Sequence, residues 1–151
     1  MISQQIESQL EELRDNQTAI VVEGREDRKA LQYFGLTNIL VLYTKPFYKI
    51  IEALQAFPEI VILTDLDKEG KHLYAKINDE CSRRGIKINN SFRHFLFKKT
   101  ELAHIEGLPR YVERIREKEA ILGHRKATAR VLLHLSMKPE PRLPTKRPLK
   151  G

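Results

Sequence analysis

The stretch that most constrains the fold of this chain runs from Val61 to Lys71 and reads VILTDLDKEGK. Its first four residues are apolar or β-branched and predict a short buried strand. Asp65 and Asp67 follow at once, and the chain then turns into an amphipathic segment. A buried strand that ends in acidic residues and leads into a helix is typical of an open α/β sheet, which builds its sites at the carboxyl ends of its strands.

Asp65 and Asp67 are candidate metal ligands. Positions i and i+2 of extended backbone point the same way, so both side chains can aim at one point. Clustered carboxylates suit a hard cation such as Mg²⁺. The alternative interpretation is a solvated turn in which an aspartate caps the next helix.

A second strand that ends in an acid lies upstream. Residues 19–23, AIVVE, are an apolar run that closes on Glu23, and Gly24 follows. The next residues predict a helix over 25–34, with Gly35 at the position of a C-terminal cap. If these two strands are neighbours in a parallel sheet, the glutamate and the aspartate pair converge. Three carboxylates in one crevice require a cation or a raised pKa to relieve their repulsion.

The segments VVEGRED and ILTDLDKEG resemble the two signature motifs of the Toprim domain, which primases, type IA and type II topoisomerases and small maturation nucleases share. The resemblance spans about residues 19–106. By size, the chain is most similar to the stand-alone archaeal and bacterial Toprim proteins and to the nuclease that matures 5S ribosomal RNA. The resemblance implies that Asp65 and Asp67 hold Mg²⁺ or Mn²⁺, and that Glu23 acts as general base or acid.

Other residues around the two motifs are candidate parts of the same site. Arg25, Lys68 and Lys71 flank the acids and can neutralise phosphodiester charge, or alternatively balance nearby carboxylates. Glu106 follows a predicted fourth strand at 101–105, ELAHI, and is expected near the metal. Its alternative role is that of a helix N-terminal acid favoured by the helix dipole. The remaining predicted neighbours of the site are Gly24, Glu69 and Gly70.

The predicted architecture is a three-layer α/β fold, with a four-stranded, mainly parallel sheet and helices on both faces. The other expected strand lies within 36–43, and short helical periodicity favours a helix rather than a strand within 86–100. We expect two helices after the sheet, one starting at Pro109 and one over 124–137. The predicted organisation is an N-terminal packing helix at 1–18, a Toprim core domain at 19–123, and a basic helix with a Pro-rich tail at 124–151.

The excess of positive over negative charge lies in the last segment of the chain. Residues 124–151 carry eight basic residues against one acid, which accounts for the whole net charge of +7. Basic arms usually bind polyanions such as nucleic acid, although a solvated tail that aids solubility is the alternative. The tail residues expected to contact nucleic acid are Lys138, Arg142, Lys146 and Arg147.

Cysteine and histidine are interpreted as structural. Cys81 is expected to be a small core residue rather than a nucleophile. Because it is the only cysteine and no cationic-apolar leader is seen, we expect no internal disulfide and a cytoplasmic location. His94 and His104 show no metal-ligand spacing and are interpreted as packing or surface residues. The apolar runs are shorter than a membrane span, so no membrane partner is expected.

Together with these observations, the resemblance implies a Mg²⁺-dependent Toprim protein that acts on nucleic-acid phosphodiesters, as an enzyme of nuclease-like RNA or DNA processing. One alternative is a non-catalytic nucleic-acid-binding accessory protein that keeps the acids for Mg²⁺-bridged phosphate contact. A weaker alternative is a receiver-like phosphoacceptor domain, which requires an acidic pair after the first strand that VVEGRE does not supply well.

Overall fold

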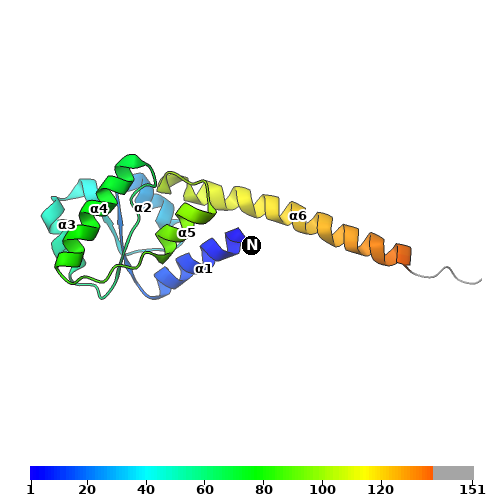
Figure 1. Ribbon diagram of the computed structural model, residues 1–151, viewed down its shortest axis with the longest axis horizontal. Coiled ribbons are helices and arrows are strands. Elements are labelled where there is room, and N and C mark those ends of the chain that lie inside the picture. Colours follow the sequence, from blue (N-terminus) through cyan, green and yellow to red (C-terminus); the bar gives the residue numbers. More distant parts are fainter. Residues whose placement is uncertain (138–151) are drawn as a thin grey trace, which may run out of the picture. The chain divides into compact units, whose positions relative to one another are not determined.

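The computed structural model describes residues 1–137 of the chain (Figure 1). The chain divides into two compact units, Met1–Glu117 and Lys118–Gly151. Both carboxylate motifs lie in the first unit. The four predicted tail contacts lie outside the described residues: Lys138, Arg142, Lys146 and Arg147.

Three parallel strands form the sheet of the first unit, in the order β2-β1-β3. They are β1 (Ala19–Val22), β2 (Ile39–Val41) and β3 (Ile60–Ile62). In the central strand β1, Ile20 lies opposite Ile39 on one side and Val61 on the other. Because all three strands run the same way, the carboxyl ends of β1 and β3 lie side by side. The residues that follow these ends are the two acidic motifs.

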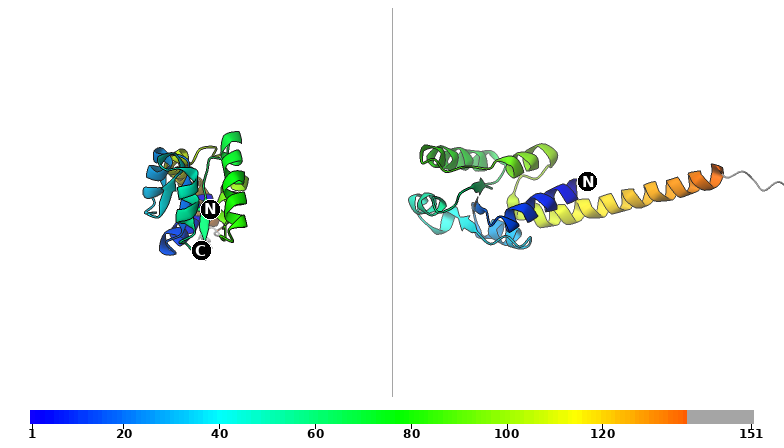
Figure 2. Two further views of the ribbon diagram at one scale, coloured as in Figure 1. Left: turned by 90° about the vertical axis from the view of Figure 1, so that its left-hand side faces the viewer. Right: turned by 90° about the horizontal axis from the view of Figure 1, so that it is seen from below.

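Helices cover both faces of this sheet, which is why its strands are apolar on both sides (Figures 1 and 2). One face packs against α1 (Ile2–Asp15), α2 (Arg25–Gln32) and α5 (Ser91–Lys99). The other face packs against α3 (Phe47–Leu54) and α4 (Lys68–Arg83). The predicted α/β class, with a parallel sheet between helices, is confirmed.

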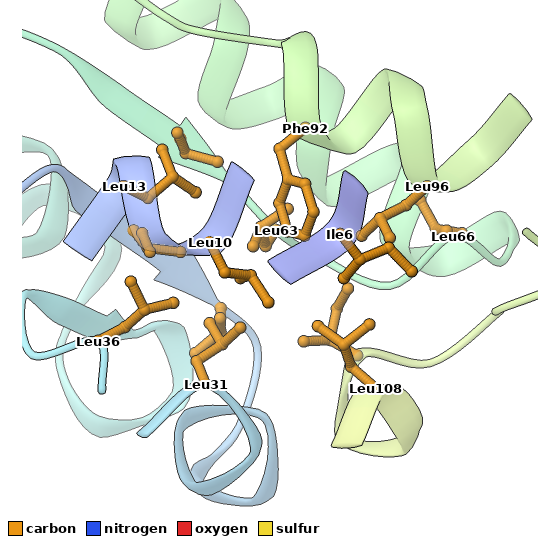
Figure 3. Close-up of a cluster of buried hydrophobic side chains, with 14 of the residues drawn as sticks. Ile6, Leu10, Leu13, Leu31, Leu36, Leu63, Leu66, Phe92, Leu96 and Leu108 are labelled. Carbon is orange, nitrogen blue, oxygen red and sulfur yellow. The ribbon is translucent and has the colours of Figure 1, made fainter. Parts of the chain in front are cut away.

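The larger core cluster joins α1 to the sheet and to its neighbouring helices (Figure 3). Ile6, Leu10, Leu31 and Leu96 gather there, each with at most 1% of its surface exposed. Burying an aliphatic side chain of this size contributes about 1.5–3 kcal/mol relative to leaving it exposed. The N-terminal helix is therefore part of the core, in agreement with its predicted packing role.

The smaller cluster, on the other face, contains the single cysteine. Cys81 of α4 is fully buried and packs with Ile50 and Ile77. Burial raises the pKa of its thiol to about 11. A thiol in this state is a core group and not a nucleophile.

The predicted fourth strand at 101–105 is not confirmed. Among the described residues, the edge of the sheet beyond β3 is taken by Ile88, which forms a single parallel bridge with Ile60. Residues 101–104 have no regular structure, and Ile105–Gly107 form the short 3₁₀ helix η2. Ile105 is fully buried, so the apolar pattern of ELAHI reflects side-chain packing and not sheet pairing.

One continuous helix, α6 (Leu108–Met137), replaces the two helices expected after the sheet. Pro109 lies in its first turn, where a missing N–H has no cost. Gly123 does not end the helix, because a single interior glycine costs only about 1 kcal/mol relative to alanine. Leu108 and Val112, in the first two turns of α6, are buried in the core. A second 3₁₀ helix, η1, spans Leu42–Thr44. None of the helices formed by residues 1–137 is long and apolar enough to cross a membrane.

Candidate metal centre

Glu23 and Asp65 meet across the carboxyl ends of β1 and β3. The backbone N–H of Asp65 donates to Oε1 of Glu23 at 2.9 Å. This contact joins two residues 42 positions apart in the sequence. Partial burial raises the pKa of Glu23 above its ordinary value; the hydrogen bond opposes this shift, and the negative charges of Asp65, Asp27 and Asp67 add to it.

The turn after β3 is held to the start of α4 by short contacts. Asp67 is the N-cap of α4, and its Oδ1 accepts the N–H of Gly70 at 2.8 Å. The hydroxyl of Thr64 donates to the carbonyl of Gly70 at 2.6 Å. The helix approaches so closely that a Cβ placed on Gly70 would lie 1.9 Å from the carbonyl oxygen of Asp65. Glu69, the next residue back along α4, is exposed.

The helix-capping alternative therefore accounts for Oδ1 of Asp67, and Oδ2 remains available to bind a ligand. The same division holds for Asp65, whose Oδ1 accepts the N–H of Ile105 at 2.9 Å. The second oxygens of the two aspartates, both Oδ2, face the ring of His104.

His104 completes a group of potential metal ligands with the two aspartates. Its Nδ1 lies 3.2 Å from Oδ2 of Asp65 and 3.8 Å from Oδ2 of Asp67. One ligand atom from each of the three residues lies within 4.8 Å of the others. The hydrogen bond to Asp65 raises the pKa of His104. From the sequence, His104 is interpreted as a packing or surface residue because no second ligand stands near it in the chain.

Arg93 of α5 holds the turn after β3 through hydrogen bonds to its backbone. This role was not predicted from the sequence. Its guanidinium donates to the carbonyl of Thr64 and, at 3.1 Å, to the carbonyl of Asp65. Only 8% of this residue is exposed, and its guanidinium lies 4.7 Å from the ring centroid of Tyr74. The sequence signal is weak, because Arg93 is one of several basic residues in a short helix, between Phe92 and His94.

A cleft of about 520 Å³ opens beside Glu23. Asp27 is one of its acids and is buried, with Oδ2 accepting the N–H of Gly24 at 3.0 Å. Burial raises the pKa of Asp27, while the hydrogen bond from Gly24 opposes this rise. Asp27 was not predicted from the sequence, although its place three residues after Gly24 is typical of a helix-capping acid. The other residues that line the cleft are Gly24, Arg25, Glu26, Val41, Tyr43, Thr44, Asp65 and Glu106.

The three predicted basic contacts lie in different places. Arg25 lines the acidic cleft. Lys68 is exposed at the first position of α4 and is not among the residues that line the cleft. Lys71 lies over the ring of Phe97, 4.7 Å from its centroid, and lines a separate hollow of about 170 Å³ with Tyr74. The structure thus brings the acids Glu23, Asp65, Asp67 and Glu106 to one end of the sheet, but it does not gather the three basic residues there.

Comparison with known proteins places the chain among archaeal relatives. No protein-family model matches it. It is 34% identical over 100 residues to a UPF0292 protein of Methanocaldococcus jannaschii, covering 63% of this chain and 78% of the relative. It is 30% identical over 105 residues to a UPF0292 protein of Pyrococcus horikoshii, covering 68% and 80%. A solved structure, described as a putative protein from Aquifex aeolicus, matches with a TM-score of 0.60 and 32% identity, covering 64% of this chain and 92% of that one.

Proposed function

The chain belongs to the UPF0292 family, and we propose that it is a Toprim-like enzyme, dependent on Mg²⁺ or Mn²⁺, that cleaves nucleic-acid phosphodiesters. The observation that carries the proposal is the contact between Glu23 and Asp65 at the ends of neighbouring parallel strands. With Asp67 beside them, these are the residues to which the Toprim resemblance assigns metal binding and proton transfer.

The donor set fits a divalent cation bound through oxygen. Oδ1 of Asp65 and Oδ1 of Asp67 each accept a hydrogen bond from a backbone N–H. This bond orients the carboxylate and leaves Oδ2 available for a ligand. Carboxylate oxygens and water are the ligands that Mg²⁺ prefers, and Mn²⁺ takes similar sites. The bound cation would supply charge stabilisation to the phosphoryl oxygens of the scissile phosphate.

Glu23 is the residue proposed to move a proton. Its Oε1 is fixed by the N–H of Asp65, so the second oxygen, Oε2, is the one that would exchange a proton with water or a leaving oxygen. A general acid or base works best when its pKa lies near the working pH, and burial shifts the pKa of Glu23 in that direction. The bound cation would oppose this shift, which limits how far the pKa rises.

Charge outside the acidic group supports a nucleic-acid substrate. Arg25 lines the cleft and can neutralise a phosphate next to the one that reacts. Residues 124–151 carry the whole net charge of +7, and the sequence-independent part of nucleic-acid affinity comes from such charges. In this proposal the sheet end supplies the chemistry and the basic segment supplies affinity.

The test is incubation of the full chain with labelled 5S precursor RNA, tRNA, plasmid and single-stranded DNA, each with Mg²⁺ or Mn²⁺. Glu23→Gln keeps the shape of the side chain and removes its titratable proton. The matched control is Glu12→Gln, at an exposed position of α1. Discrete products that disappear in Glu23→Gln and persist in Glu12→Gln support the proposal. Gel shifts without products would support the non-catalytic accessory protein instead, and the absence of both would overturn the proposal.

A further inference from the structure

We infer that His104 is a third protein ligand of the proposed cation, and that its nitrogen makes the site prefer Mn²⁺ to Mg²⁺. The inference rests on the proposed metal site at Asp65 and Asp67. It goes beyond that site because the acidic motifs alone supply only oxygen ligands.

The interatomic distances fit shared coordination. Two ligands at right angles around a cation, with bonds of about 2.1 Å, lie about 3 Å apart. Nδ1 of His104 lies 3.2 Å from Oδ2 of Asp65 and 3.8 Å from Oδ2 of Asp67. A cation can therefore enter between these three atoms after small rotations of the side chains.

The backbone on both sides of His104 fixes it opposite the two aspartates. The carbonyl of Ala103 accepts the N–H of Leu66, the residue between them, at 2.7 Å. On the other side, the N–H of Ile105 donates to Asp65 at 2.9 Å. The side chain of Ile105 is fully buried, which anchors this segment in the core. Residues 101–105, which were expected to form a fourth strand, instead pack against the turn after β3 and place the imidazole of His104 beside it.

A nitrogen ligand changes which cations the site favours. Mg²⁺ is held almost entirely by oxygen, whereas imidazole is a ligand for first-row transition metals. Two carboxylates and one imidazole still suit an octahedral ion that keeps water ligands. The His104 side chain is 57% exposed, so water has access to the remaining positions. Mn²⁺ is a first-row transition ion that also takes the carboxylate and water ligands used in metal-assisted phosphodiester cleavage.

The experiment measures Mn²⁺ and Mg²⁺ affinity of the full chain by titration, with Mn²⁺ followed by electron paramagnetic resonance. The variants are His104→Gln and Asp67→Asn. The matched control is His72→Gln, at an exposed position of α4. We expect His104→Gln to weaken Mn²⁺ binding at least about tenfold and Mg²⁺ binding by less than about threefold, and His72→Gln to change neither. Pulsed resonance of the Mn²⁺ complex should show coupling to a directly bound nitrogen that disappears in His104→Gln.

The outcomes separate this inference from the proposed function. If Asp67→Asn loses Mn²⁺ but His104→Gln binds as wild type and no nitrogen coupling is seen, the metal site stands and the role of His104 is wrong. An equal loss of Mn²⁺ and Mg²⁺ in His104→Gln would refute the selectivity. If the wild type binds neither cation, the proposed site and the role of His104 are both wrong. The same conclusion follows if Asp67→Asn binds both cations as tightly as the wild type does.

Discussion

Replacing Gly70 by alanine tests whether the turn after β3 is as tightly built as the structure indicates. A Cβ at this position would lie 1.9 Å from the carbonyl oxygen of Asp65. That oxygen cannot simply move away, because the guanidinium of Arg93 donates to it at 3.1 Å. Gly70 is itself held on both sides, through its N–H to Asp67 and its carbonyl to Thr64.

Two opposing effects decide the sign of the change. Alanine is favoured over glycine within a helix by about 1 kcal/mol, which would stabilise the protein. An ordinary carbon–oxygen contact is about 3.3 Å or longer, so the new methyl group must displace backbone by more than about 1 Å. Overpacking of a well-packed site costs typically about 1–3 kcal/mol, and a clash with fixed backbone belongs at the upper end. We therefore expect Gly70→Ala to lower the free energy of unfolding by about 2 kcal/mol.

The assay is urea and thermal unfolding, with Gly107→Ala as the matched control. A Cβ at Gly107 would meet only the side chain of Leu102, at an ordinary 3.5 Å, so this variant should stay within about 0.5 kcal/mol of wild type. For a chain of this length, 2 kcal/mol corresponds to a decrease in Tm of about 4–8 °C. A Gly70→Ala protein as stable as wild type would show that the helix does not approach Asp65 this closely.

Three further outcomes are expected. Arg93→Met should lower the free energy of unfolding by about 2–4 kcal/mol in urea titrations, because buried carbonyl groups lose their donor; an unchanged midpoint would contradict this. Because burial raises the pKa of Glu23, the metal-free folded protein keeps this proton at a pH where the unfolded chain has released it. Wild type should therefore lose stability relative to Glu23→Gln as pH rises above the ordinary pKa of a glutamate, about 4.3, and a constant difference would show that Glu23 is not buried as described. Deleting residues 138–151, which lie outside the described residues, should make the slope of log affinity against log salt concentration shallower for RNA and DNA. The expected change is about 0.7–0.9 for each phosphate that the shortened chain no longer neutralises. An unchanged slope by fluorescence anisotropy would mean that this segment does not contact phosphate.

The parts of the fold that the sequence predicts well are those in which local pattern and tertiary role agree. The apolar runs that become β1 and β3 are buried on both faces, and a continuous apolar run is typical of a parallel strand. Gly35, which the sequence predicts as a helix cap, follows α2 with a φ of 84°, a conformation that glycine adopts without steric cost. The convergence of Glu23 and Asp65 follows from strand adjacency alone, since the carboxyl ends of parallel neighbours share one edge.

The parts that were missed depend on contacts between distant segments. The ELAHI pattern fits a strand, but at the edge of the sheet beside β3 it is Ile88 that pairs with Ile60. His104 reaches a residue 39 positions away, and no periodicity of the chain reports such a pairing. Arg93 likewise has partners 28 to 31 residues away. Local sequence shows that these residues are polar or charged, and only the folded chain shows what they bind.

The position of the metal can be measured directly by anomalous diffraction from crystals of the full chain grown or soaked with Mn²⁺. We expect an anomalous peak about 2.1–2.3 Å from Oδ2 of Asp65 and Oδ2 of Asp67, with Glu23 on the side of the adjoining cleft. The same crystals of Asp67→Asn should lose the peak. A strong peak bound elsewhere on the protein, with none between the two aspartates, would contradict a metal centre at the ends of β1 and β3.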